Sequence, residues 1–355
     1  MDGTLAPPTP RIGYCCLYRP PVPDPAEEKR FNVSGTTITA LSRMERADAF
    51  EKVLALVARN VDALERHVRR VATASPIERL LRLSSDILPA YTHPVARWMY
   101  DEPVMHELVE TGLARVGEIA RRGGVRLSLH PGQYCVLAST NPSAAENGIA
   151  DFEYHTDLMR WLGHAGGWHP YGAHINVHVG SAATGVEGFR AGLARLSEDA
   201  RGLVTVENDE SGFGLDDLLP LVDTLPLVFD FHHHWIKSGG DYIRPDDPRI
   251  ASIQASWRGV RPLSHISVSR EDVLEGHPDD ALPDFAALVA AGKTMRDLRA
   301  HSDGMWNRAV NAWVAAHLAW TDIEVEAKFK NLASHQLAEH VRRDGWNYAP
   351  PEAGT

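Results

Sequence analysis

The chain has 355 residues, of which 44% are hydrophobic and 23% charged, the balance of a globular protein with a large buried core. Its formal net charge of −11 argues against indiscriminate binding of nucleic acid, which depends on neutralising phosphates. Its 3 cysteines make no disulfide framework, and no apolar run approaches the roughly 18 residues of a membrane span. Because the start also lacks a secretory signal, we expect a soluble protein of the cytoplasm.

Apolar runs and helical patterns alternate along the chain. Residues 1–10, rich in proline, predict a flexible arm, and residues 11–345 predict a single domain. Strands are predicted at 11–17, 80–83, 125–130, 173–179, 203–206, 227–229, 261–267 and 322–328. Helices are predicted at 46–71, 105–121, 154–162, 186–196, 214–222 and 332–341. The stretch 268–299 interrupts this alternation and predicts an insertion before the last strand. Strands and helices alternating in this way are typical of a (β/α)₈ TIM barrel.

Two successive strands, at 203–206 and 227–229, each end in side chains that bind metals. Glu207 opens the run Glu-Asn-Asp-Glu after the first strand, and Asp230 with His232–His234 follows the second. The chemistry of parallel α/β folds lies at the carboxyl ends of their strands. Carboxylates and imidazoles there are suitable ligands for Zn²⁺ or Mn²⁺. Either run alone is equally consistent with a polar loop, but the two in succession favour a metal site.

Most of the other late strand ends repeat this pattern. The predicted ligands at strand ends, or between the last two strands, are His130, His178, Glu207, Asp230, His233, His265, His301 and Glu326. Several carboxylates and histidines at one rim predict a multinuclear site. Two or three metals there would activate water and clamp the oxygens of a phosphodiester. His174 shares a strand face with His178 but lies deeper, and we expect it to be structural.

The sequence His130-Pro-Gly-Gln133-Tyr134 is a sharp motif at the predicted rim. Its simpler interpretation is a Pro-Gly turn with a surface tyrosine. Its functional interpretation is a probe, because an amide and an aromatic ring can hydrogen-bond to and stack with bases displaced from a duplex. Tyr14, at the end of the first strand, is expected to reach the same place.

Several motifs together resemble the UV damage endonuclease family. In chain order they are Arg11-Ile-Gly-Tyr14, Arg82-Leu-Ser-Ser-Asp-Ile-Leu-Pro89, Thr92-His-Pro94, His130-Pro-Gly-Gln-Tyr134, Asn176-Val-His-Val-Gly180, Glu207-Asn-Asp-Glu210, Phe229-Asp-Phe-His-His-His234, Arg299-Ala-His-Ser-Asp303 and Glu326-Ala-Lys328. Each motif is weak alone, but the ordered set is specific.

The resemblance implies a TIM barrel related to the apurinic endonucleases, with two or three divalent metal ions per chain. Manganese is expected first, with zinc or iron as alternatives. The implied activity is DNA repair by incision of the backbone immediately 5′ to UV photoproducts. The implied partner is damaged double-stranded DNA. We also expect a monomer associated with the nucleoid and no membrane partner, although the sequence leaves a dimer open.

The resemblance also implies a role for each matching residue. One metal would be held by His130, His178 and Glu207. Glu207 would bridge to a second, held also by Asp230, His265 and Glu326, while His233 and His301 would hold a third. The implied catalytic residues are Glu207, Glu326 and His265, and those that contact the damaged dinucleotide are Tyr14, Gln133 and Tyr134.

One position departs from the family pattern. Family members usually carry Pro-Lys-x-His on the seventh strand, where the lysine is carboxylated and serves the metals. This chain reads Pro262-Leu263-Ser264-His265. Because leucine neither ligates a metal nor accepts a proton, the departure predicts weak occupancy of the site formed by His233 and His301.

Two other functions stay open. A metal isomerase, epimerase or oxidase of the same barrel superfamily would act on a sugar or a peptide and would need an enclosed pocket, whereas an endonuclease needs a basic groove. A damage-binding protein without catalysis is the third hypothesis. Basic residues near predicted strand ends slightly favour the groove, namely Arg258, Arg261, Arg270, Lys328 and Lys330.

Overall fold

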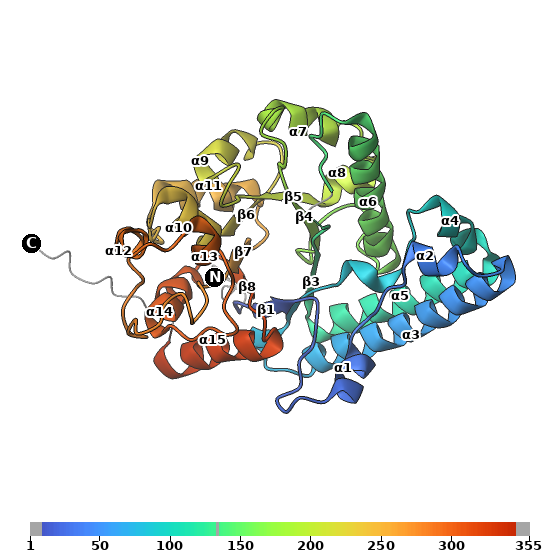
Figure 1. Cartoon of the computed structure of the whole chain (residues 1–355), viewed down its shortest axis with the longest axis horizontal. Helices are drawn as coiled ribbons and strands as arrows, with labels where there is room; N and C mark the ends of the chain where they lie inside the picture. The colour runs from blue at the N-terminus through green and yellow to red at the C-terminus, as the bar shows by residue number, and fades with distance from the viewer. Residues whose placement is uncertain (1–8, 133–134, 346–355) are drawn as a thin grey trace, which may run out of the picture.

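Each of the eight predicted apolar runs forms a strand, and the strands close into a parallel barrel in chain order, with β8 beside β1 (Figure 1). The computed structural model describes residues 9–132 and 135–345. Its strands are β1 (Ile12–Cys15), β2 (Leu80–Arg82), β3 (Arg126–Leu129), β4 (His174–His178), β5 (Val204–Glu207), β6 (Leu227–Asp230), β7 (Leu263–Ile266) and β8 (Asp322–Val325). The prediction of a TIM barrel is confirmed.

Helices connect the strands on the outside of the barrel. The α-helices are α1 (Pro25–Phe31), α2 (Ile38–Leu41), α3 (Arg46–Ala72), α4 (Pro94–Arg97), α5 (Pro103–Gly123), α6 (Pro142–Trp161), α7 (Gly185–Leu193), α8 (Glu198–Leu203), α9 (Leu215–Leu218), α10 (Phe231–Ser238), α11 (Pro248–Ser256), α12 (Phe285–Ala290), α13 (Met295–Leu298), α14 (Arg308–His317) and α15 (Asn331–Asp344). Short 3₁₀ helices are η1 (Pro76–Glu78), η2 (Ser85–Ile87), η3 (Trp98–Asp101) and η4 (Leu219–Leu221). No helix in these described ranges is long and apolar enough to cross a membrane.

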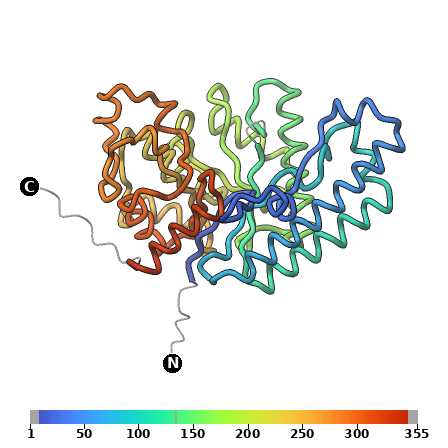
Figure 2. Tube along the Cα trace, turned by 60° about the horizontal axis from the view of Figure 1, so that its bottom comes forward, coloured from blue at the N-terminus to red at the C-terminus, as the bar shows by residue number. Residues whose placement is uncertain are grey.

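The longest helices, α3 and α5, pack side by side and extend well beyond the barrel (Figures 1 and 2). On α3 the buried side chains of Val53, Val57, Val61, Leu64 and Val68 recur every three or four residues. This spacing places them on one face of the helix, which is the face that the sequence predicted to be buried.

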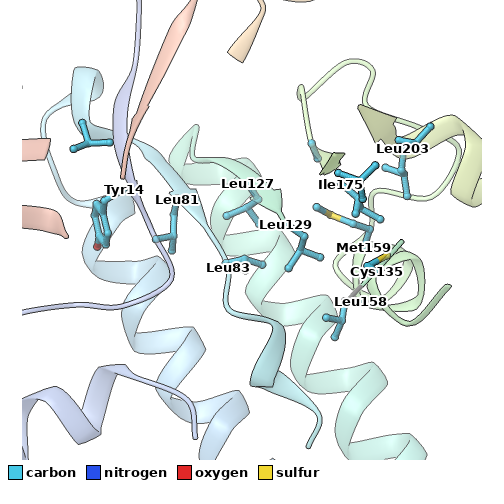
Figure 3. Close-up of a cluster of buried hydrophobic side chains, with 14 of the residues drawn as sticks. Tyr14, Leu81, Leu83, Leu127, Leu129, Cys135, Leu158, Met159, Ile175 and Leu203 are labelled. Atoms are coloured by element: carbon cyan, nitrogen blue, oxygen red, sulfur yellow. The ribbon is translucent and has the colours of Figure 1, made fainter. Parts of the chain in front are cut away.

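Strand residues alternate between the outer and inner faces of the barrel. Side chains on the outer face, such as Leu81, Leu127, Leu129 and Ile175, pack with the surrounding helices in the main core (Figure 3). The inner face is largely polar. This contrast means that the core lies mainly between strands and helices, while the barrel interior carries charge.

The lower part of the interior, at the amino ends of the strands, is closed by an ion pair and an apolar cluster. Arg126 donates to Asp322 at 3.0 Å, and both side chains are buried. Leu263 packs with Trp257, Leu80, Val228 and Trp168. Leu263 therefore lies one inward position below His265, as strand alternation predicts.

Between β7 and β8, the stretch 268–299 contains α12 and α13. Ser269 forms an antiparallel bridge with His301. Phe285 and Leu298 belong to a small buried cluster around Trp235 of α10. The stretch therefore packs against the helix that follows β6, and it brings His301 back to the rim.

Candidate metal centre

The predicted ligands come from separate strands but meet at the carboxyl end of the barrel. Adjacent strands hold their registers so that His178 lies opposite Glu207 and Asp230 opposite His265. His130 and Glu326 directly follow β3 and β8. His233 lies on α10, whose first turn begins where β6 ends.

Glu207 lies at the centre of this rim, and four imidazoles surround its carboxylate. Its Oε2 is 3.2 Å from His130 Nε2 and 3.8 Å from His178 Nε2. Its Oε1 is 3.0 Å from His265 Nδ1 and 3.5 Å from His233 Nδ1. The Glu207 side chain is 1% exposed, so imidazole nitrogens rather than water surround its charge. A carboxylate with imidazoles on both oxygens is suited to bridge two metal ions.

Among the described residues, three sets of side chains bring possible ligand atoms within 4.8 Å of one another. They are His130, His178 and Glu207; Glu207, Asp230 and His233; and His265, Glu324 and Glu326. Glu207 belongs to two sets. Every predicted ligand except His301 belongs to at least one.

His301 lies at the margin of the centre. Its Nδ1 is 3.9 Å from Glu326 Oε2, and its ring centre is 6.4 Å from that of His233. His233 itself lies nearer to Glu207 and Asp230. The structure thus groups His233 with the bridging carboxylate, whereas the resemblance paired it with His301.

The charges in the centre are strongly coupled. Burial alone would raise the pKa of Glu207, but the imidazoles of His265 and His178 hold it well below its usual range. Burial would lower the pKa of His265, but Glu207 and Glu324 raise it to about 10. For His233, Asp230 and Glu207 likewise outweigh burial and raise the pKa to about 9. Glu207, His265 and His233 thus stabilise one another's charged forms, whereas burial raises the pKa of Asp230 and lowers that of His130.

The donor set fits divalent cations. Two buried atoms of the predicted ligands, Asp230 Oδ2 and His178 Nδ1, have no hydrogen-bond partner. Buried polar atoms are normally satisfied, so these atoms indicate missing partners. Mixed histidine and carboxylate ligands are those that Mn²⁺, Zn²⁺ and Fe²⁺ accept.

Asp230 and Asn208 position His233. The backbone N–H of His233 donates to Asp230 Oδ1 at 2.6 Å, which caps α10. Asn208 forms two hydrogen bonds, each of 2.9 Å, with the backbone of Asp230. These contacts tie the ends of β5 and β6 together and leave Asp230 Oδ2 free for the centre.

Tyr14 does not lie where we expected it. Its side chain is 5% exposed and faces α3, and its hydroxyl is 2.8 Å from His67 Nε2 (Figure 3). The inward position is the next one, Cys15, whose Sγ is 3.6 Å from Lys330 Nζ. Strand alternation points Tyr14 away from the barrel interior, so its position gives no support to the expected contact with substrate, which stays a prediction.

Gln133 and Tyr134 lie outside the described residues. Their neighbours Gly132 and Cys135 line a cavity of about 260 Å³ beside the centre, which His130 and His178 also line. Gly132 and Ser211 on its wall are exposed, so the cavity reaches the protein surface.

His174 lies deep in the barrel, as expected for a structural residue. It is fully buried, its Nδ1 is 2.8 Å from the carbonyl oxygen of Gly172, and its ring meets that of Trp257 edge-on. It belongs to none of the three sets of possible ligands found in the described part of the chain.

Two of the five basic residues that we assigned to a groove lie at the opposite end of the barrel. Arg261 precedes β7 and donates to Asp322 at the start of β8, and Arg258 donates to the carbonyl oxygen of Thr224 before β6. Lys328 and Arg270 follow strands and lie on the side of the metal centre. These two positions therefore do not support a basic groove around the metal centre.

Sequence reasoning missed Glu324 and Arg82. Glu324 lies on β8, two residues before Glu326, so strand alternation would have identified it as inward-facing. Arg82, at the end of β2, lies 3.0 Å from Glu324 and 2.6 Å from Glu326. Its guanidinium supplies positive charge beneath the carboxylate-rich rim.

A model of the family "UV-endonuclease UvdE" matches residues 10–346. The chain belongs to the UvdE family. The UV DNA damage endonuclease of Bacillus pumilus (strain SAFR-032) is 28% identical to this UvdE-family chain over 276 residues, which are 74% of each protein. The UV-damage endonuclease of Schizosaccharomyces pombe is 30% identical over 277 residues, which are 74% of this chain and 43% of that protein.

The crystal structure of SacUVDE shares the fold. It superposes with a TM-score of 0.71 at 20% sequence identity, covering 95% of this UvdE-family chain and 99% of the other. The match to the family model and the named relatives confirm the resemblance that the ordered motifs predicted, and the shared fold agrees with it.

Proposed function

We propose that the protein is a metal-dependent endonuclease of DNA repair, which incises the backbone immediately 5′ to UV photoproducts. Membership of the UvdE family and the names of the relatives support the UV-damage endonuclease role. The observation that carries the metal dependence is the shared position of Glu207 in two sets of ligand-type side chains. Manganese is the metal we propose, with zinc or iron as alternatives.

In this proposal Glu207 bridges two metals, one held with His130 and His178 and the other with Asp230 and His233. His265 and Glu326 complete the centre, with His301 at its margin. Bound divalent ions would supply an activated water and charge stabilisation for an in-line displacement at phosphorus. Glu207, Asp230 and His265 are buried within the barrel mouth, so they hold their geometry before DNA arrives and little reorganisation is needed during the reaction.

The surrounding side chains keep this geometry rigid. Asn176 donates to Glu207 Oε2, and Asn208 fixes the backbone of Asp230. The residue after His130 is Pro131, and the Nδ1 of His130 lies 2.9 Å from the carbonyl oxygen of that proline. This contact restrains the orientation of the His130 ring. Ligands restrained by such contacts keep one orientation, which favours high metal affinity.

We further propose that Gln133 and Tyr134 contact the displaced bases. They follow His130 in the sequence, and their flanking residues line the surface-reaching cavity. A double substitution, Gln133→Ala with Tyr134→Ala, should reduce the preference for damaged over intact duplex by roughly 1–3 kcal/mol per lost stacking contact. Metal content should stay unchanged, and an unchanged preference would remove both residues from the recognition site.

The proposed activity is tested by nicking of supercoiled plasmid. UV-irradiated and untreated plasmid are each incubated with wild-type protein, with added Mn²⁺ or with a chelator. We expect nicking of irradiated plasmid only, and only with metal. A 5′-labelled duplex with one cyclobutane pyrimidine dimer then locates the cut. Binding of damaged DNA without nicking would instead support the damage-binding hypothesis.

The small-molecule hypothesis receives less support. An isomerase or epimerase would need to enclose its substrate, whereas the cavity beside the centre reaches the surface at Gly132 and Ser211. Turnover of sugars with no nicking of any plasmid would reverse this preference.

A further inference from the structure

Glu324 is a buried carboxylate directly beneath the metal centre, and the proposed ligand roles do not explain it. The side chain is 0% exposed. Its Oε2 accepts a hydrogen bond of 2.9 Å from Ser128 Oγ, while its Oε1 lies 3.0 Å from Arg82 Nε in a buried ion pair. Burying a carboxylate costs free energy even when it is paired, so its place needs a reason.

The oxygen that pairs with Arg82 also faces His265. The Nε2 of His265 lies 3.6 Å from Glu324 Oε1. The other ring nitrogen, Nδ1, faces the rim, at 3.0 Å from Glu207 and 3.4 Å from Glu326. The imidazole therefore stands between two groups of carboxylates, one at the proposed metals and one below them.

This is the arrangement that orients a metal-binding histidine. An imidazole that binds a metal through one nitrogen usually donates the N–H of its other nitrogen to a carboxylate or carbonyl group, which fixes its tautomer and raises its basicity. Strand β7 offers no polar partner below His265, because the next inward residue is Leu263 in an apolar cluster. The partner comes from β8, where Glu324 is the register neighbour of His265.

We propose that Glu324 is a positioning residue of the metal centre, whose carboxylate accepts the Nε2–H of His265 and so directs Nδ1 toward the metals. This inference rests on the proposed metal centre. It also explains how the chain keeps a negative charge near the centre although Leu263 occupies the seventh-strand position.

The contacts of Arg82 argue against two simpler roles for Glu324, namely direct binding of a metal and mere neutralisation of Arg82. Its guanidinium contacts both carboxylates, with NH1 2.6 Å from Glu326 and Nε 3.0 Å from Glu324. Direct ligation by Glu324 is disfavoured because its carboxylate lies one inward position below Glu326, and its oxygens already contact Ser128 and Arg82. Neutralising Arg82 alone does not account for Glu324 either, because Glu326 already pairs with Arg82 at the shorter distance.

The test titrates Mn²⁺ into metal-free wild-type protein, Glu324→Met and Glu324→Gln, and counts bound metal after desalting. We expect both variants to bind as many ions as the wild type. The weakest-bound ion should dissociate about 10–100-fold more readily in Glu324→Met, the range seen for lost outer-sphere partners. Glu324→Gln should be affected less, because its amide oxygen still accepts a hydrogen bond. It also preserves the shape of the side chain if the methionine variant folds poorly.

Ser264→Ala is the matched control. Ser264 lies on the outer face of β7 and is 3.0 Å from Thr321 Oγ1, so this variant loosens the β7–β8 region without touching Glu324. We expect its metal affinity to equal that of the wild type. An equal loss of affinity in Ser264→Ala and Glu324→Met would show a general structural effect and overturn the proposal.

A spectroscopic measurement examines the hydrogen bond itself. In Zn²⁺-loaded protein labelled with ¹⁵N-histidine, the Nε2–H signal of His265 is assigned by its absence in His265→Gln. We expect this proton to resonate far downfield in the wild type and to move upfield and exchange faster in Glu324→Met. An unchanged signal, an unchanged affinity, or loss of a whole metal equivalent would each overturn the positioning role. Wild-type protein that takes up no metal would refute the metal centre as well.

Discussion

At the scale of single residues, the metal centre depends on one carboxylate more than on any histidine. Glu207 contributes to two sets of possible ligands, whereas His178 contributes to one. For both His265 and His233 the nearest carboxylate oxygen is Glu207 Oε1. Removing the charge of Glu207 would therefore remove the closest negative charge from both imidazoles. The cost of a substitution should therefore follow the number of metals that a side chain serves.

We predict that Glu207→Gln lowers metal affinity and nicking rate by about 10²-fold or more, and that His178→Gln has a smaller effect. Titration of Mn²⁺ and plasmid nicking measure both quantities. The exposed substitution Glu187→Gln is the control and should behave as the wild type. Equal losses for Glu207→Gln and His178→Gln would show that the carboxylate does not bridge.

His317 shows how burial fixes a protonation state far from the centre. Its Nε2 donates to the carbonyl oxygen of Ile243 at 3.1 Å, and its Nδ1 accepts from Trp320 Nε1 at 3.1 Å. Burial lowers its pKa to about 3. The folded protein therefore keeps this imidazole neutral at a pH where the unfolded chain, with a histidine pKa of about 6.5, binds a proton.

Stability should accordingly fall as the pH decreases from about 6.5 toward 3, by about 1.4 kcal/mol per pH unit for this histidine. We predict that His317→Gln, although less stable at pH 7, loses about 2 kcal/mol less than the wild type between pH 7 and pH 5. Urea unfolding at the two pH values measures the difference. Parallel losses in both proteins would mean that His317 titrates normally in the fold.

At the scale of elements, the contact between α5 and the turn after α6 leaves no room for a side chain. A Cβ built on Gly117 would lie 1.8 Å from the carbonyl oxygen of Leu162. Backbone atoms cannot move aside as a flexible side chain can, so α5 would have to shift. Glycine at this position is thus required by the close approach of two backbones.

We predict that Gly117→Ala destabilises the protein by about 1–3 kcal/mol or more, although alanine is the better helix former. Thermal or urea unfolding measures the loss. The control, Thr111→Ala on the exposed face of α5, should be neutral or slightly stabilising. A Gly117→Ala protein as stable as the wild type would show that α5 can slide at no cost.

The elements also show which parts of the fold were predictable from the sequence. The strands were found because their outward residues are apolar and because each short run lies between helical patterns. The helix α10 was missed because its residues Phe231–His234 follow β6 without a break, so the histidine run resembled a loop of ligands. The capping aspartate, Asp230, was the available signal.

Inward and outward positions were harder to assign than strands. On β8 the predicted ligand Glu326 fixes the alternation and identifies Glu324. On β1 the inward residues are Gly13 and Cys15, which carry no signal of a carboxylate or histidine ligand, so Tyr14 was assigned to the wrong face. The sequence shows which side chains of a strand point into the barrel only where one residue of that strand has a recognised role.

At the scale of the whole molecule, the two ends of the barrel have different tasks. The carboxyl end carries the proposed metal centre, with Lys328 beside it, 54% exposed and paired with Asp303 at 3.0 Å. The amino end holds Arg258, Arg261 and Arg126, which satisfy backbone carbonyl groups and Asp322. With a net charge of −11, only a local cluster of cations can attract DNA.

We predict that Lys328→Ala weakens binding to damaged and intact duplex by a similar factor. It should also reduce the slope of log K against log salt by about 0.9. Arg258→Ala, at the opposite end, should leave both quantities unchanged. Fluorescence anisotropy at several salt concentrations measures them. A stronger effect of Arg258→Ala would place the DNA at the other end of the barrel.

The double use of Asp230 has a consequence for anyone who wishes to transplant this centre into another scaffold. One oxygen caps α10 and the other is free for the proposed metal centre, while Asn208 of the preceding strand end holds its backbone. Copying only the ligand side chains would omit the first turn of α10, which orients Asp230 and His233. The smallest segment that could be transferred intact is therefore the end of β5, the end of β6 and the first turn of α10 together.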